Sequence, residues 1–394
     1  MIDKASNLAK YQWIIILTSI LFLAGCAKPY IPPVIEPLNS SDQQFDGLLT
    51  LLSKHGSLHV VWIHGMCPHT KEDWAGRRVS ELAERLGIEL DNLPQSLAIG
   101  DFVYRYLISY KNKSIVLDMV VWSEIIEQRR RSLCFDSRHA DDGVVYEACG
   151  ENARYPHRRA VINNALKSGL INSCLADALI YTGAQGSEVR ARLRPEIEAA
   201  LSSPPDGNQT PLLFVSESLG SKIIFDTVQE IMDQSSSYSS ESTFAMMLAN
   251  TSQIIMFANQ IPILDLTEPE PDPSDMESAS VNNNSSSLRG FVSGINRLKR
   301  LKMEMTGEKI ERLKVIAFSD PNDVLSYRLP KGYFPDKMKT DTINIMPSND
   351  YVWFGLLEHP LNAHKNYIYT DDVINRFLCG NPISTKCLSD LPNK

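Results

Sequence analysis

The sequence lacks the features that mark several large classes of protein. Lysine and arginine number 39 against 47 aspartate and glutamate residues, so the net charge is −8 and no basic excess exists to hold nucleic-acid phosphates. Seven cysteines in 394 residues are too few for a small fold built on disulfides. Phosphate loops, dinucleotide-binding glycine turns and zinc-binding His-Glu-x-x-His helices are missing, as are internal repeats. We therefore expect a globular protein with no cofactor, no metal and no nucleic-acid partner.

Long apolar runs are also missing. The longest apolar run that the sequence does contain lies near the N-terminus. Residues 13–24 are almost entirely apolar, but about 12 residues are too few to cross a hydrocarbon layer of ~30 Å comfortably. A start containing Lys4 and Lys10 precedes this run, which is typical of a secretory signal. The run ends in Leu23-Ala-Gly-Cys26, which resembles the lipobox of bacterial lipoproteins. An uncleaved membrane anchor is the alternative, and either one places the remaining chain outside the cytoplasm.

The lipobox resemblance implies a lipid-anchored protein of the cell envelope. It implies cleavage before Cys26, a diacylglyceryl group on the sulfur and an acyl chain such as palmitate on the new N-terminus. Several acyl chains, at about 0.8 kcal/mol per buried CH₂, would hold the protein firmly on a membrane. Because Ala27 and not aspartate follows the cysteine, the resemblance implies the outer membrane if the host is Gram-negative.

Six cysteines remain after such cleavage, and an even number in an oxidising compartment indicates disulfides. Cys379 and Cys387 are the best candidate pair, because they bracket the turn-forming sequence Gly-Asn-Pro. Cys134 with Cys149 is a second candidate. Connectivity beyond this cannot be deduced from the sequence.

Downstream of the signal at 1–25, we expect a tether at 26–57 and a single domain at 58–394. Apolar strand-like runs lie at 58–63, 211–215, 253–258, 313–318 and 342–346, and residues 102–122 resemble a hairpin. Helical spacing is found at 73–90, 175–201, 222–232, 289–313 and 371–378. This alternation predicts an α/β fold with a mostly parallel sheet covered on both faces. Insertions are expected near 124–175 and 265–300, the latter containing an acidic, proline-rich excursion at 267–287.

One sequence feature carries chemistry. The strand at 211–215 runs directly into Ser216-Glu-Ser-Leu-Gly220 and then into a helix. This pattern resembles the nucleophile elbow of the α/β-hydrolases, whose usual form is Gly-x-Ser-x-Gly. The elbow is so tight that it requires small residues two positions before and after the nucleophile. Ser216 stands at the first of these positions and Gly220 at the second, so Ser218 is the nucleophile that the resemblance implies. Alternatively, Ser218 would only cap the helix.

The resemblance also implies an acid and a base, in the chain order Ser, Asp, His. Two acids follow the strand at 313–318. We favour Asp323, because Asp323-Val-Leu leads into the next segment, and Asp320 is the second choice. Two histidines lie later in the chain. We favour His364, in a loop after the last strand, whereas His359 precedes a proline and would shape the loop.

An oxyanion hole completes the expected site. The strand at 58–63 ends in His64-Gly65, and in the hydrolase family this loop supplies one backbone N–H, here that of Met66. The second N–H would come from Leu219, directly after the nucleophile. The His64 side chain is expected to be structural. His64, Cys67 and His69 also have metal-ligand spacing, but no fourth ligand is evident, so we expect no metal there.

Together these resemblances imply a lipid-anchored serine hydrolase that cleaves carboxylic esters, similar to esterases and lipases. The expected partners are a membrane, through Cys26, and a small acyl ester or lipid as substrate. Two other functions remain open. One is an inactive hydrolase-fold protein that binds partners in the envelope, and the other is an acyltransferase that uses the same triad. The sequence does not indicate the acyl length or the oligomeric state.

Overall fold

The computed structural model describes residues 26–27, 32–38, 43–89, 95–133, 159–203, 209–234, 242–268, 286–308, 311–353 and 355–392. The expected signal at 1–25, both Cys134 and Cys149, and most of the acidic excursion lie outside the described residues. None of the helices in the described part of the chain has the length and apolar character needed to cross a membrane.

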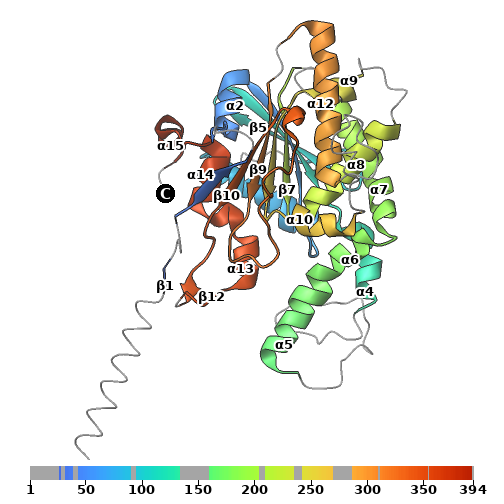
Figure 1. Ribbon diagram of the computed structural model, residues 1–394, viewed down its shortest axis with the longest axis vertical. Coiled ribbons are helices and arrows are strands. Elements are labelled where there is room, and N and C mark those ends of the chain that lie inside the picture. Colours follow the sequence, from blue (N-terminus) through green and yellow to red (C-terminus); the bar gives the residue numbers. More distant parts are fainter. Residues whose placement is uncertain are drawn as a thin grey trace, which may run out of the picture.

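A nine-stranded, mostly parallel sheet forms the centre of the molecule (Figure 1), in the order β2-β10-β9-β8-β7-β3-β6-β5-β4. A small second sheet has the order β1-β11-β12. The strands are β1 Cys26–Ala27, β2 Val34–Pro37, β3 Ser57–Ile63, β4 Leu97–Ala98, β5 Val103–Tyr110, β6 Lys113–Val120, β7 Leu212–Glu217, β8 Thr251–Phe257, β9 Leu313–Phe318, β10 Thr340–Met346, β11 Val352–Trp353 and β12 Leu357–Glu358.

Helices cover both faces of the large sheet. They are α2 Leu48–His55, the π-helix η1 Lys71–Gly76, α3 Arg77–Arg85, α4 Glu127–Arg131, α5 Val161–Ala165, the π-helix η6 Leu166–Leu175, α6 Ala176–Thr182, α7 Gly186–Ser202, α8 Gly220–Gln234, α9 Thr243–Ala249, α10 Ile261–Leu264, α12 Ser287–Thr306, α13 Pro360–Lys365, α14 Asp371–Cys379 and α15 Thr385–Asp390, with short 3₁₀ turns η3 Ser123–Ile126, η7 Asp265–Thr267, η8 Asp336–Met338 and η9 Tyr367–Tyr369.

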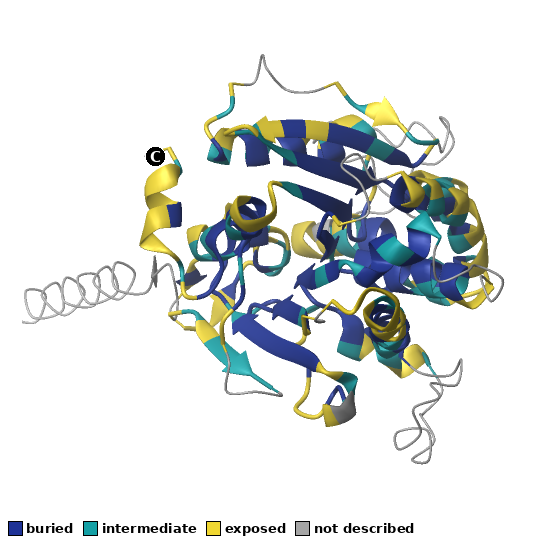
Figure 2. Ribbon diagram, turned by 90° about the horizontal axis from the view of Figure 1, so that it is seen from above, coloured by how far each residue is buried: buried dark blue, intermediate teal, exposed yellow. Residues whose placement is uncertain are grey.

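Two hydrophobic cores follow from this layering, one on each face of the sheet. Helices α7, α8, α9 and α12 contribute to the first, and α2, α3 and α14 to the second. The central strands are therefore buried on both faces, as the dark blue ribbons of Figure 2 show. Strands buried on both faces must be almost continuously apolar, and this is why their sequences have no alternation. The expected α/β architecture with a mostly parallel sheet is thus confirmed.

The hairpin expected within 102–122 is confirmed as β5 and β6. Lys111 and Asn112 connect the two strands with φ angles of 49° and 61°. Positive φ at both central residues is the geometry of a type I′ turn, whose twist matches that of the flanking strands.

Several expected boundaries differ from the structure. Within the expected tether at 26–57, β2 pairs antiparallel with β10 and α2 packs its leucines into the second core. The reason is that Leu48–His55 has an amphipathic helical spacing, which the proline content upstream obscured. Within the expected insertion at 265–300, α12 begins at Ser287 and buries Phe291 and Ile295 against the sheet. The expected helix at 73–90 ends at Arg85.

The connections of the central strands identify the edge of the sheet at which a ligand is expected. From β3 the chain passes to β6 on one side, and it later returns to β7 on the other side of β3. In open α/β sheets, ligands bind at the carboxyl ends of the strands where the direction of winding changes in this way. The carboxyl ends of β3 and β7 are followed by His64-Gly65 and by Ser218 respectively.

Candidate active site

Ser218 lies in a sharp turn between β7 and α8. Its φ angle is +53°, a left-handed conformation that residues with a side chain rarely adopt, and its N–H donates to the carbonyl of Phe257 at 2.8 Å. Strained backbone of this kind persists only where the surrounding structure enforces it, and it concentrates at functional sites. Ser218 is 3% exposed.

Close backbone approach explains why small residues surround this turn. A Cβ atom added to Gly220 would lie 2.3 Å from the carbonyl oxygen of His64, and one added to Gly65 would lie 2.8 Å from the Cβ of Ser218. Ser216, in place of the usual glycine, is buried and its hydroxyl lies 2.9 Å from that of Ser221. The extra hydroxyl is therefore hydrogen-bonded, and the departure from glycine is accommodated.

The histidine and aspartate favoured from the sequence lie beside Ser218. The Nε2 atom of His364 lies 3.1 Å from the Ser218 Oγ, and its Nδ1 lies 2.9 Å and 3.0 Å from the two carboxylate oxygens of Asp323. His364 belongs to α13, so the expected loop is in fact a short helix that begins at Pro360, a residue favoured at the first helical position.

Asp323 is held as an anion on the far side of the imidazole. Its carboxylate also accepts hydrogen bonds from the Leu325 N–H and from the hydroxyl of Tyr367, each at 3.0 Å. Burial opposes the ionisation of Asp323, but the hydrogen bond and charge of His364 outweigh burial and lower the pKa of Asp323 below its ordinary value. An ionised acceptor at Nδ1 directs the lone pair of Nε2 toward Ser218.

The second-choice acid, Asp320, has other partners. Its carboxylate accepts the N–H groups of Asn322 at 2.8 Å and Asn349 at 2.5 Å, and no contact with His364 is found within the described residues. Burial raises the pKa of Asp320 to about 6. The geometry therefore associates Asp323, and not Asp320, with the imidazole.

Tyr367 was not found by sequence reasoning. It is fully buried, it donates to Asp323, and its hydroxyl accepts the N–H of Asp320 at 2.7 Å. It thus holds the loop that carries both acids against the segment that follows His364. Its position shortly after His364 is the only signal in the sequence.

The expected oxyanion-hole residues lie at the two sides of the turn. Leu219 follows Ser218, and Met66 follows Gly65, which packs directly against Ser218. Among the described residues, neither the Met66 N–H nor the Leu219 N–H has a hydrogen-bond partner. Buried N–H groups without partners are rare, so both are available to an oxygen of a ligand.

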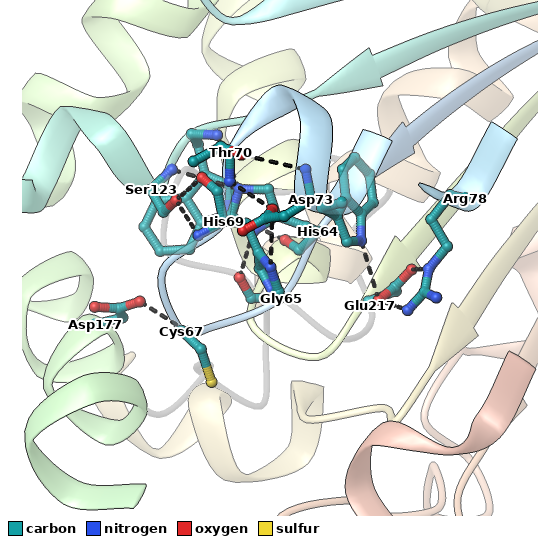
Figure 3. A network of polar contacts seen from close by, with 12 residues as sticks. His64, Gly65, Cys67, His69, Thr70, Asp73, Arg78, Ser123, Asp177 and Glu217 are labelled. Atoms are coloured by element: carbon teal, nitrogen blue, oxygen red, sulfur yellow. Dashed lines mark hydrogen bonds and ion pairs between the residues drawn. The ribbon is translucent and has the colours of Figure 1, made fainter. Parts of the chain in front are cut away.

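A disulfide that sequence reasoning did not identify supports the loop around Met66. Cys67, with φ +82°, is bonded to Cys174 of η6. Its N–H donates to Asp177 at 2.9 Å, as drawn in Figure 3, and Asp177 forms a buried ion pair with Arg130. These contacts join the loop after β3 to the helices η6 and α6. Separately, Cys379 and Cys387 form the expected disulfide.

His64 and His359 have structural partners. The His64 Nδ1–H donates to the Gly65 carbonyl at 2.7 Å, and its Nε2 accepts the Trp122 N–H at 3.0 Å. Burial holds the pKa of His64 well below its ordinary value, so the ring is neutral. His359 accepts the N–H of Asn362 at the start of α13. The Cys67 sulfur is bonded to Cys174 and therefore has no thiolate to offer a metal ion. Among the described residues, no group of three possible metal ligands is found.

An ion pair beside Ser218 was also missed from the sequence. Glu217 accepts two hydrogen bonds from Arg78, at 3.0 Å and 3.2 Å (Figure 3). It also accepts one from the Trp62 indole at 3.1 Å. Burial opposes its ionisation, but the charge of Arg78 outweighs burial and lowers the pKa of Glu217. Bidentate pairs of this kind fix orientation, so the residue next to Ser218 is held in one position.

No protein-family model matches the chain, and no curated protein matches its sequence. The geometry of the site is therefore the basis for assigning a function.

Proposed function

We propose that this chain has the α/β-hydrolase fold and is a serine hydrolase that cleaves carboxylic esters, in the manner of esterases and lipases. The observation that carries the proposal is the continuous set of contacts from Ser218 Oγ through His364 to Asp323, which starts at a residue with strained backbone. Nucleophile, base and orienting acid within hydrogen-bond reach are the signature of an activated serine.

The proposed reaction has two halves. Ser218 Oγ attacks the acyl carbon while His364 Nε2 accepts its proton, and the Met66 and Leu219 N–H groups stabilise the oxyanion of the tetrahedral intermediate. When the intermediate collapses, the bond to the alcohol oxygen breaks and His364 returns the proton to the leaving alcohol. Water, activated by the same imidazole, then releases the acid and regenerates Ser218.

A fluorophosphonate probe tests this proposal, because it labels only an activated serine. We expect covalent labelling of the wild type, no labelling of Ser218→Ala, and full labelling of the control Ser187→Ala, whose serine lies on the exposed side of α7. A folded wild type that resists the probe would contradict the hydrolase and support the inactive binding protein. Product analysis with an added alcohol distinguishes hydrolysis from acyl transfer, since a transferase would form a new ester.

The proposal places the enzyme in the cell envelope, anchored through lipid on Cys26, and in the outer membrane if the host is Gram-negative. The Leu23-Ala-Gly-Cys26 sequence is its support. Labelling of cells with radioactive palmitate should mark the wild-type protein and not Cys26→Ser. Palmitate-free wild-type protein would contradict the anchor without affecting the triad.

A further inference from the structure

Two segments with exposed apolar side chains project from the end of the molecule that holds the candidate site. Figure 1 shows α5 and the hairpin of β11 and β12 extending beyond α10 and α13 at this end. At the hairpin, Trp353 is 52% exposed, Leu356 85% and Leu357 61%. Soluble surfaces carry single exposed apolar residues, but neighbouring ones at a loop tip indicate a surface that binds something apolar.

The second segment is the arm formed by α5, η6 and α6. Val161 and Ile162 at its tip are 85% and 74% exposed, and Leu166, Ile171 and Leu179 along it are also exposed. Ile162 and Leu166 are four residues apart and therefore lie on one face of the helical arm. This apolar face has no partner within the described part of the chain, whereas Cys174, near the end of η6, is bonded to Cys67 of the body.

Both segments are directly connected to the residues of the candidate site. The hairpin is followed after one residue by α13, which carries His364. The arm is joined by the disulfide between Cys174 and Cys67 to the loop of Met66. What binds to these two tips therefore contacts segments that lead directly to His364 and to the loop of Met66.

The backbone pairing of β1 identifies the occupant. Strand β1 runs antiparallel to β11, with Cys26 opposite Trp353 and Ala27 opposite Val352. The residue proposed to bear the lipid is thus held on the same hairpin that exposes Trp353 and Leu356. Acyl chains on Cys26 can enter a bilayer only if this hairpin lies at its surface. Tryptophan is enriched at that depth because its ring has both apolar and polar parts.

From these observations we infer that the hairpin and the tip of the arm dock on the bilayer that holds the Cys26 acyl chains. The candidate site then opens toward that bilayer, and its substrate is the acyl ester of a membrane lipid. This inference rests on the proposed function for the identity of the reaction and on the proposed anchor for the identity of the surface.

Tryptophan fluorescence tests the docking independently of catalysis. Of the tryptophans after Cys26, Trp62, Trp74 and Trp122 are buried and only Trp353 is exposed. The lipidated protein is reconstituted in vesicles of phosphatidylglycerol and phosphatidylcholine with brominated acyl chains. We expect bromine to quench part of the emission in the wild type and none in Trp353→Phe. Equal emission from the wild type in brominated and unbrominated vesicles would overturn the docking.

The substrate class is tested by the ratio of two activities. For each variant, hydrolysis of phosphatidylglycerol vesicles is divided by hydrolysis of a water-soluble short-chain ester. We expect Val161→Asp with Ile162→Asp to lower this ratio at least about tenfold, because charged tips oppose insertion. The control, Leu97→Asp with Leu107→Asp, changes exposed leucines on β4 and β5 at the far edge of the sheet and should leave the ratio unchanged.

The outcomes separate the two proposals. An unchanged ratio in the arm variant, or wild type that cleaves the soluble ester but no vesicle lipid, would overturn the inference and leave the hydrolase standing. A wild type that cleaves neither substrate and resists the fluorophosphonate probe would contradict the proposed function, while bromine quenching would still decide whether the surface docks.

Discussion

Replacing Asp323 by asparagine should reduce turnover far more than the same replacement at Asp320, although both acids are buried and lie in one loop. The Asp323 carboxylate accepts from His364 Nδ1 at 2.9 Å, and a carboxamide can present its NH₂ group to that atom instead. His364 would then carry its proton on Nε2 and could not accept one from Ser218. This loss of the correct tautomer lowers the rate on the order of 10⁴-fold, or about 5.4 kcal/mol in the barrier.

At Asp320 the same change removes a hydrogen-bond acceptor without touching the imidazole. The carboxylate accepts one N–H on each oxygen, from Asn322 and Asn349, and asparagine can accept only one of them. The unsatisfied buried N–H should cost about 1–3 kcal/mol of unfolding free energy. Turnover should remain within about tenfold, because the Ser218, His364 and Asp323 contacts persist.

The assay is kcat for a soluble ester at saturating concentration and pH 8, together with urea unfolding of each variant. The pH lies well above the pKa of Asp320, about 6, so both carboxylates are ionised in the wild type. Equal losses of kcat in the two variants, or a greater loss in Asp320→Asn, would refute the assignment of Asp323 as the orienting acid.

Three further predictions concern stability. Gly220→Ala should destabilise the fold by at least about 1–3 kcal/mol in urea unfolding, because the added Cβ would lie 2.3 Å from a backbone oxygen. In the control Gly169→Ala, the added Cβ meets no atom within 4 Å, so this variant should be tolerated. Equal stabilities of the two variants would contradict the close packing at Gly220. Replacing Cys67 and Cys174 by serine should cost up to about 4.8 kcal/mol of unfolding free energy, since the disulfide closes a loop of 107 residues. An unchanged denaturation midpoint would argue against this pairing. Burial, together with the charge of Asp320, raises the pKa of Glu358 from 4.5 to about 7, so the folded protein binds this proton more tightly than the unfolded chain does. The unfolding free energy should therefore fall as the pH rises from 4.5 to about 7. Glu358→Gln should flatten that dependence.

Local sequence patterns were sufficient to predict the strands and helices that form continuous apolar runs or have a helical period. Strands β3, β7, β8, β9 and β10 are continuous apolar runs, and α8, α12 and α14 have a clear helical period, so each was expected close to its observed position. The serine turn between β7 and α8 could be located for the same reason, because its small residues are spaced within five positions. Leu48–His55 was missed because a proline-rich segment precedes it and hides a short amphipathic helix.

Long-range contacts could not be read in this way. Cys67 and Cys174 are 107 residues apart, and nothing in their neighbourhoods pairs them. Tyr367 of η9 meets Asp323 only when η9 packs against the loop after β9, and Arg78 of α3 meets Glu217 only when α3 packs against β7. In each case, the residues next to the contact in the sequence form no motif that identifies its partner.

By itself, the sequence determined the class of the fold, the lipobox-like start and the turn that carries Ser218, because each depends on residues that are neighbours in the chain. Only the tertiary structure decided which carboxylate faces His364, since Asp320 and Asp323 are three residues apart and the local pattern favoured Asp323 without excluding Asp320. It also decided that Cys26 lies opposite Trp353, and so on which side the proposed anchor would meet the molecule. That relation depends on strand pairing across more than 300 residues, which no local pattern encodes.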